Sequence, residues 1–195
     1  MKQELAKYVL LALATAITAY SPVLVAIAQS TTPAEKTTKQ EIRAAVLFNN
    51  TKGENVGNAT LIQVTDGVLM KVVLKDLPSG AHAIHIHEKG ACSPPATFAD
   101  AGAHLNPGNN PHGFMAEHGP HAGDMPNITV AADGTFQGDI LNENVTLDPN
   151  DTSKRALLVD KDGATIVVHV DADDYETQPS GDAKDRIACA EITKQ

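Results

Sequence analysis

The sequence predicts an all-β domain, a sandwich or a barrel, for the chain beyond residue 40. Apolar residues alternate with others, or form short apolar runs, over residues 42–48, 69–77, 84–86 and 166–170, as expected for strands with a buried face. Turn signals that contain glycine accompany these segments at 65–67, 78–80, 132–134 and 161–163. No long segment in this part has a convincing helical period. Many short strands with regular turns are typical of sandwiches and barrels.

The first 28 residues have the pattern of a secretory signal peptide. The first seven residues are positively charged through Lys2 and Lys7. The apolar run from Tyr8 to Ala28 follows and ends in a small-x-small cleavage pattern. A retained anchor is the alternative because the run is long enough to span a bilayer, but Pro22 and this ending favour cleavage. We therefore expect a signal peptide at 1–28, a polar flexible leader at 29–40 and a folded domain at 41–195. The protein would be exported, and so periplasmic or extracellular.

Charge excludes some classes of partner. The chain carries a formal charge of −9, and the segment 1–28 contributes +1 through Lys2, Lys7 and Glu4, so the remainder carries −10. A chain this acidic offers no general basic surface, and we expect no nucleic acid and no stable membrane partner. The two cysteines, Cys92 and Cys189, predict a disulfide in an exported protein. Two separate buried thiols are the alternative.

Two long segments interrupt the strand pattern, at 89–127 and 171–185. Loops this long in a compact domain are usually functional or disordered. The first contains four of the eight histidines, which favours a function.

The segment Ala83–His87 places two histidines on one face of a strand. Side chains alternate across a strand, so Ile84 and Ile86 can face the core while His85 and His87 project together from the other face. Their Cα atoms would lie about 6.6 Å apart, close enough to share one metal ion. Two surface histidines would give the same pattern.

The first long segment also carries the side chains of a zinc site. Three imidazoles and one carboxylate make a closed tetrahedral site for Zn²⁺, and the candidates are His104, His112, His121 and Asp124. A flexible polar loop with scattered histidines is the alternative. His169 ends an apolar strand and becomes a candidate ligand because the other histidines need a partner. An all-imidazole site suits copper.

Five motifs together resemble the copper–zinc superoxide dismutases, closest to their bacterial exported branch. They are Gly80–Glu88 (GAHAIHIHE), Ala101–Pro107 (AGAHLNP), His121–Asp124 (HAGD), Val167–His169 (VVH) and Arg186–Cys189 (RIAC), and the likeness extends from about residue 42 onward. The resemblance implies a Greek-key β-sandwich or flattened barrel of about eight antiparallel strands with two long functional loops. It also implies that superoxide is disproportionated to dioxygen and hydrogen peroxide by alternate reduction and oxidation of copper.

The resemblance also implies a role for each site residue. Copper would be bound by His85, His87, His104 and His169, and zinc by His104, His112, His121 and Asp124, so that His104 bridges the two ions. Arg186 would pair with the superoxide anion, and Asp173 would orient one ligand of each metal. Cys92 would be joined to Cys189. His82 would be structural and His118 a surface residue. The family includes monomers and dimers, so a homodimer is compatible with the resemblance.

Charge near the substrate path predicts weak electrostatic steering. Residues 90–153 contain no Lys or Arg, and Arg186, Lys184 and Lys89 are outnumbered by the acidic residues of 171–185. The main alternative function is an exported metal-buffering or metal-delivery module on the same fold. A structural adhesion sandwich is weaker still, since it would not need seven ligands in register.

Overall fold

A computed structural model describes residues 41–94 and 97–193. The expected signal peptide (1–28) and leader (29–40) lie outside the described residues, so their assignment stays a prediction. Among the described residues, no helix has the length and apolar character that crossing a membrane requires.

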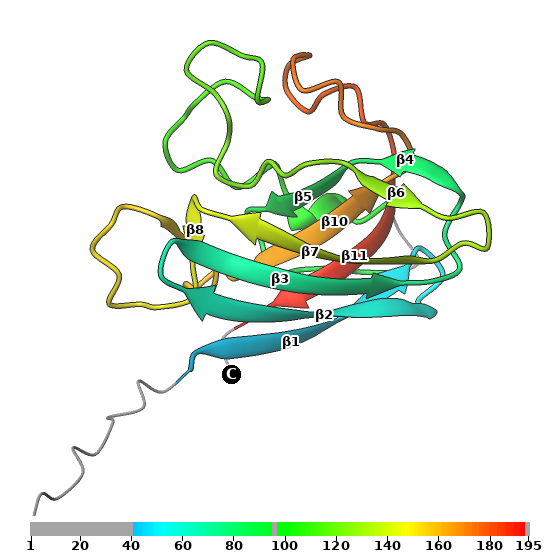
Figure 1. Cartoon of the computed structure of the whole chain (residues 1–195), viewed down its shortest axis with the longest axis horizontal. Coiled ribbons are helices and arrows are strands. Elements are labelled where there is room, and N and C mark those ends of the chain that lie inside the picture. The colour runs from blue at the N-terminus through cyan, green and yellow to red at the C-terminus, as the bar shows by residue number, and fades with distance from the viewer. Residues whose placement is uncertain (1–40, 95–96, 194–195) are drawn as a thin grey trace, which may run out of the picture. The chain divides into compact units, whose positions relative to one another are not determined.

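Most strands of the domain form one curled antiparallel sheet (Figure 1). Its spatial order is β5-β10-β11-β1-β2-β3-β7, with β1 at Arg43–Asn50, β2 at Asn55–Val64, β3 at Gly67–Leu74, β5 at Ile84–His87, β7 at Phe136–Asn142, β10 at Ala164–His169 and β11 at Arg186–Ile192. Two short pairs complete the fold: β4 (Gly80–His82) is antiparallel to β6 (Ile128–Val130), and β8 (Val145–Thr146) is parallel to β9 (Ala156–Leu157). The predicted all-β fold class is confirmed, with several strands shorter than expected.

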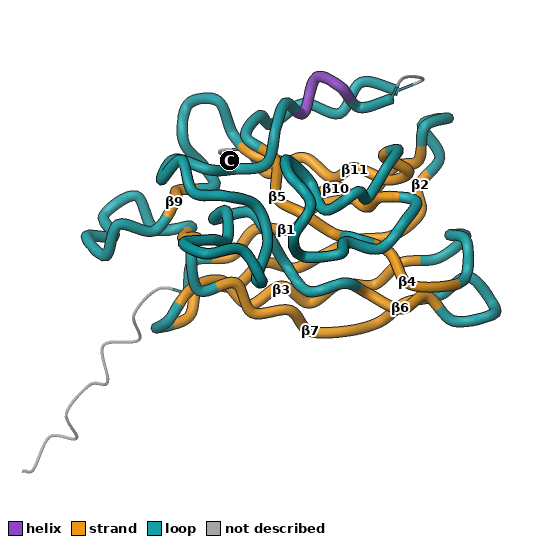
Figure 2. Tube along the Cα trace, turned by 90° about the horizontal axis from the view of Figure 1, so that it is seen from above, coloured by secondary structure: helices purple, strands orange, loops and turns teal. Residues whose placement is uncertain are grey.

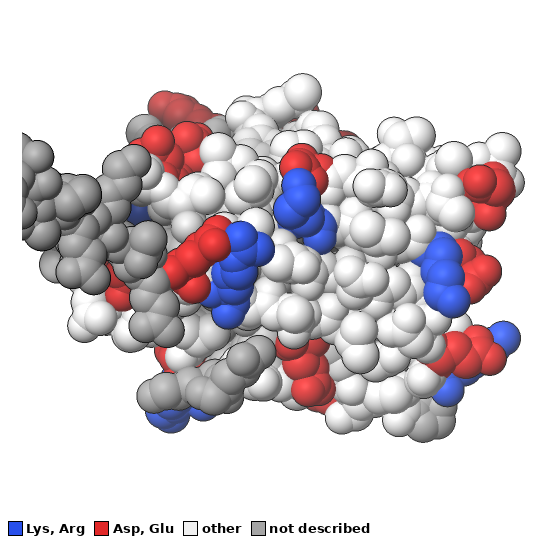
Figure 3. All heavy atoms as spheres, turned by 60° about the horizontal axis from the view of Figure 1, so that its bottom comes forward, with Lys and Arg blue, Asp and Glu red and all other residues white. Residues whose placement is uncertain are grey.

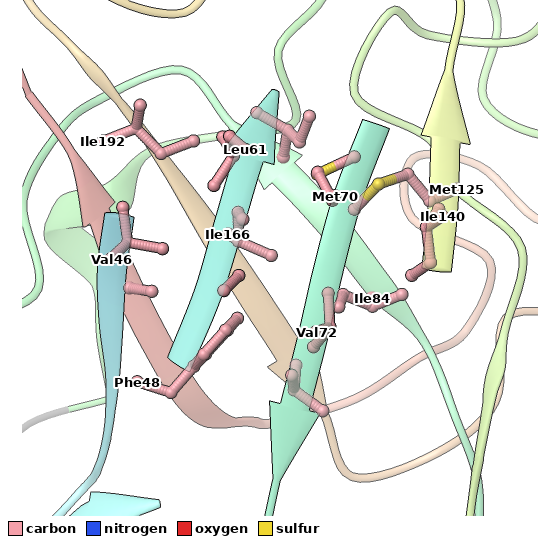
Figure 4. Packing of buried hydrophobic residues seen from close by; sticks show 14 of the residues in the cluster. Val46, Phe48, Leu61, Met70, Val72, Ile84, Met125, Ile140, Ile166 and Ile192 are labelled. Atoms are coloured by element: carbon pink, nitrogen blue, oxygen red, sulfur yellow. The ribbon is translucent and has the colours of Figure 1, made fainter. Parts of the chain in front are cut away.

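The core follows from the alternation read in the sequence. Ala44, Val46 and Phe48 of β1 are buried while their neighbours are exposed or half-buried, and β3 buries every second residue from Val68 to Leu74. Figure 4 shows buried side chains from different parts of the chain packed together, among them Met70, Ile84 and Ile166 of the sheet and Met125 of the first loop. Ile84 and Ile86 belong to this core, which fixes the opposite direction for His85 and His87.

Two long loops stand on the same side of the sheet (Figure 1). The first connects β5 to β6 and contains a short 3₁₀ turn, Ala99–Ala101; the second connects β10 to β11. Figure 2 shows these connections among the loops, which are drawn in teal. Their extents agree with the predicted loops at 89–127 and 171–185.

The first loop is fastened to the sheet by the predicted disulfide. Cys92 and Cys189 are joined, with an S–S distance of 2.02 Å, and Cys189 lies in β11. Around the bond is a small second core of Phe98, Ala101 and Val167. The disulfide therefore ties the beginning of the loop to the strand that starts at Arg186.

Candidate metal centre

One group of four imidazoles lies at the end of the sheet. Each of its members offers one ring nitrogen within 4.8 Å of one from every other member, and all are buried. The residues of this strand-borne cluster are His85 and His87 of β5, His169 of β10 and His104 of the first loop. Pairing of β5 with β10 places Val167 beside His85, so the histidines of neighbouring strands meet on one face.

The unpartnered nitrogens of the strand-borne cluster fit a metal ion. One nitrogen of each ring is bonded within the protein: His85 Nε2 to Asp173 at 2.8 Å, His87 Nδ1 to the Gly102 carbonyl at 3.0 Å and His169 Nδ1 to the Lys184 carbonyl at 3.1 Å. The other nitrogen of each ring is buried without a hydrogen-bond partner, as is His104 Nε2. Buried polar atoms are rarely left unpaired, so four orphan nitrogens in one group indicate ligands.

A second group, the loop-borne cluster, belongs wholly to the first loop. Its members again offer ligand atoms within 4.8 Å of one another and are His104, His112, His121 and Asp124. The Asp124 carboxylate lies 2.9 Å from His104 Nδ1, 3.1 Å from His112 Nδ1 and 3.3 Å from His121 Nδ1. Three imidazoles and a carboxylate around one point form a donor set that suits Zn²⁺.

The loop reaches this position by running beside β5. Backbone hydrogen bonds join Ile86 to Gly123 at 2.8 Å and Leu105 to Ile86 at 2.8 Å, and isolated bridges pair His85 with Asp124 and His87 with His104. The approach requires glycine at position 123, because a Cβ there would lie 2.1 Å from the Ile86 carbonyl oxygen. The backbone of β5 thereby fixes the loop around residues 104–105 and again around residues 123–124.

His104 belongs to both clusters. Its Nδ1 atom faces Asp124 of the loop-borne cluster, and its Nε2 atom is one of the orphan nitrogens. The ring centroids of His104 and His85 are 4.1 Å apart, and those of His104 and His121 are 5.5 Å apart. The structure thus brings together all seven residues predicted as ligands, and His104 is a member of both groups.

Asp173 connects the clusters a second time. One carboxylate oxygen lies 2.8 Å from His85 Nε2 and the other 3.0 Å from His112 Nε2. Gly181 passes so close that a Cβ at this position would lie 1.8 Å from Asp173 Oδ1 and 2.8 Å from His112 Nε2. The predicted orienting carboxylate therefore has the contacts that the role requires.

Arg186 lies beside the strand-borne cluster, half-buried. Its guanidinium donates to the carbonyl oxygens of Phe98 at 2.5 Å and Gly102 at 2.6 Å, and Gly102 also accepts the bond from His87. Burial lowers the pKa of Arg186, and the negative charge of Asp100 opposes this shift. An arginine stays protonated throughout the ordinary pH range, so the cluster has a fixed positive neighbour.

Charge differs between the two clusters in the metal-free protein. Burial lowers the pKa of His104 to about 4 and, with help from His85, that of His169 to about 3. Burial also opposes a charge on His112, but hydrogen bonds to Asp124 and Asp173 outweigh it and raise the pKa of His112 to about 9. Hydrogen bonds from the histidines likewise outweigh burial and hold the pKa values of Asp124 and Asp173 well below their usual range.

Two further histidines lie outside both clusters. His82 is buried, and its ring nitrogens lie 2.9 Å from the His169 carbonyl and 2.8 Å from the Pro78 carbonyl, in line with a structural role. The His118 side chain is 85% exposed, with its Nε2 atom 3.5 Å from the Glu117 carboxylate, which agrees with its assignment to the surface.

Sequence reasoning missed several residues that hold this centre. Asn127 donates to the Asp173 carbonyl and accepts from its backbone amide, both at 2.8 Å, while the Tyr175 hydroxyl accepts from the Asn127 amide at 2.8 Å. The Gln178 side chain likewise bonds to both the backbone amide and the carbonyl of His112. No sequence signal identified them, because side-chain amides are common on loops and these partners are far apart along the chain.

The fold and the two clusters define an all-β protein with adjacent sites for two metal ions. The family model for copper/zinc superoxide dismutase matches residues 55–192. A "Superoxide dismutase [Cu-Zn] 2" of Aquifex aeolicus is 43% identical over 154 residues, which cover 78% of this chain and 88% of that protein. A "Superoxide dismutase [Cu-Zn]" of Caulobacter vibrioides is 42% identical, with 72% and 79% covered.

Solved structures agree with these relatives. The crystal structure of an SOD-like protein from Bacillus subtilis matches with a TM-score of 0.71 and 34% identity, and covers 76% of this chain and 97% of that one. The chain belongs to the copper/zinc superoxide dismutase family. The predicted family is confirmed, and with it the enzyme class, superoxide dismutase, and the two cofactors, copper and zinc.

Proposed function

We propose that this chain disproportionates superoxide with copper in the strand-borne cluster and zinc in the loop-borne cluster. The observation that carries the proposal is His104, whose two ring nitrogens face the two clusters. Copper favours the all-imidazole set of His85, His87, His104 and His169. Zinc favours the set that includes a carboxylate, which is His104, His112, His121 and Asp124.

The protein side chains supply binding, orientation and protons for this reaction. Bound copper supplies the one-electron redox change that converts two superoxide anions and two protons into dioxygen and hydrogen peroxide. Arg186 offers a fixed positive charge to the anion, held in place by the Phe98 and Gly102 carbonyls. His104 can hold a proton at Nε2 and deliver it to the peroxide as it leaves, while Asp173 keeps His85 and His112 in orientation.

The same proposal includes export. The pattern of residues 1–28, followed by the polar leader 29–40 and the domain from 41, supports secretion of a cleaved protein. The disulfide supports an oxidising compartment, where such bonds persist. Cell fractionation with N-terminal sequencing tests this point: a mature protein that begins at Gln29 outside the cytoplasm is expected, and an intact Met1 terminus in the cytoplasm would contradict it.

The competing function is metal buffering by the same two clusters, without turnover of superoxide. A "Superoxide dismutase-like protein" of Bacillus subtilis is 37% identical to this chain. The complete four-imidazole cluster with Arg186 beside it favours catalysis, since a buffer does not need a positioned guanidinium.

One comparison of rates separates the two functions. Superoxide turnover is measured for protein loaded with copper and zinc and for a His169→Ala variant loaded in the same way. Catalysis predicts that the variant turns over much more slowly, because it lacks one of the four imidazoles. Equal turnover by the two proteins, at the level of free copper, would favour buffering.

A further inference from the structure

Gln178 of the second loop makes a paired contact with the backbone of His112. Its Oε1 atom accepts from the His112 amide at 2.8 Å, and its Nε2 atom donates to the His112 carbonyl at 2.9 Å. Nε2 also donates to the Glu176 carbonyl at 2.9 Å. One side-chain amide thereby fixes the peptide groups on both sides of the His112 Cα atom, as a neighbouring strand would.

His112 needs such a contact more than the other ligands do. His85, His87 and His169 lie in strands, and His104 and Asp124 lie where the loop runs beside β5. The backbone amide of His121 donates to the Asp124 carboxylate at 2.9 Å. His112 lies in an irregular part of the loop. Its backbone amide and carbonyl are both bonded to Gln178, and its ring points between Asp124 and Asp173.

We propose that Gln178 is a positioning residue of the loop-borne metal site, which makes retention of zinc depend on the second loop. The inference rests on the proposed assignment of zinc to His112, His121, Asp124 and His104. The hydrogen bonds of the Gln178 side chain to the described residues go to main-chain groups. Gln178 acts by holding the His112 backbone in the orientation that aims Nδ1 at the metal, so that ordering this ligand does not weaken binding.

The test is release of zinc from copper- and zinc-loaded protein to a colorimetric chelator. Gln178→Glu keeps an acceptor for the His112 amide but cannot donate to the His112 carbonyl, and Gln178→Ala removes both bonds. Gln178 is solvent-exposed, so both variants should fold. We expect zinc affinity to fall roughly tenfold in each, in line with the loss of one or two hydrogen bonds near a ligand. With cobalt in place of zinc, the visible absorption bands should shift.

A matched control exists in β2. Gln63 also makes a full set of amide bonds, accepting from the Leu147 amide and the Thr146 hydroxyl and donating to the Val64 and Gly67 carbonyls. None of these partners belongs to either cluster. Gln63→Glu should lower the thermal midpoint while leaving zinc affinity and the cobalt bands unchanged.

Three outcomes would overturn the inference. Gln178 variants that retain zinc and the cobalt bands of the wild type would show that the contact has no positioning role. Zinc loss as large in Gln63→Glu would attribute the effect to general loosening of the fold. Unchanged zinc affinity in His112→Ala would show instead that the ligand assignment itself is wrong.

Discussion

The two clusters are built by different means although they share a side chain. Three of the four histidines in the strand-borne cluster come from β5 and β10, where alternation fixes their direction. The loop-borne cluster comes entirely from one loop and depends on backbone contacts with β5, on Asp173 and on the disulfide. A sheet positions ligands as part of its own stability, whereas a loop needs separate contacts for each ligand.

The clusters also differ in charge before any metal binds. Lowered pKa values leave His104 and His169 neutral at pH 7, whereas His112 carries a proton between Asp124 and Asp173. His104 and His169 therefore offer neutral donors, while in the loop-borne cluster the protonated His112 forms an ion pair with Asp124 and Asp173 that a metal must replace. Four experiments test how far this difference extends.

The largest effects are expected from removing one ligand of each cluster. His87→Ala should lose copper and lower turnover by more than about 100-fold, since even outer partners of a ligand contribute 10–100-fold, while zinc stays bound. His121→Ala should lose zinc and retain copper. Metal analysis and superoxide assays measure both. Loss of both metals from either variant would show that the clusters are not separable.

Asp173→Asn should weaken both sites at once, because this carboxylate contacts His85 and His112. We expect affinity for each metal to fall about 10-fold or more, as for other partners of metal ligands, with the fold intact by circular dichroism. Asp174→Asn, a neighbouring exposed carboxylate that bonds only within its own turn, is the control. An effect on one metal alone would assign Asp173 to one cluster.

The pH dependence of binding should differ between the sites. Zinc must expel the proton of His112, whose pKa is raised to about 9, so zinc affinity should increase about tenfold per pH unit from pH 7 to 9. His104 and His169 are already neutral in that window, so the copper affinity of zinc-free protein should stay nearly level. Chelator competition at several pH values measures both slopes, and parallel slopes would refute the contrast in charge.

The smallest effect concerns salt. Basic side chains on the surface are largely paired with acidic ones, as Figure 3 shows for one face, and Lys184 near the copper side is paired with Asp182. Arg186 thus faces the anion with little support, and we expect turnover to change by less than about twofold between 0.01 and 0.15 M salt. A steep fall with added salt would show that unpaired cations do steer the substrate.

The strand-borne part of the centre could be predicted from local pattern. The alternation around His85 and His87 gave their common face, and Ile84 and Ile86 lie in the core as expected. The zinc candidates followed from their side-chain types and His169 from the need for another ligand, whereas the bridge at His104 and the role of Asp173 came from the resemblance to a family. Distance along the chain explains why: Asp173 meets His85 across 88 residues, and no local period encodes such a meeting.

The side-chain amides that bond to the main chain of the two loops could not be predicted, although the disulfide that fastens the first loop was. Gln178 and Asn127 act through backbone groups 66 and 46 residues away, and any residue has those groups. The sequence pattern also did not predict β2, β7 and β11 as strands. Gly57 lies within β2 and Gly138 within β7, where they interrupt the apolar alternation. The residue type of a histidine or aspartate identifies it as a possible metal ligand. A residue that bonds to a ligand's main chain has no such signal in its residue type.

Positions of the second loop should differ in how well they tolerate substitution, and Gly181 should tolerate it least. Asp174, Glu176 and Thr177 face solvent and can drift in identity with little consequence. Any side chain at position 181 would enter the space of Asp173 and His112, and a small shift of the backbone cannot relieve an overlap of that depth. Sequences that descend from this one should vary at these exposed positions and yet keep position 181 as the residue that has no side chain.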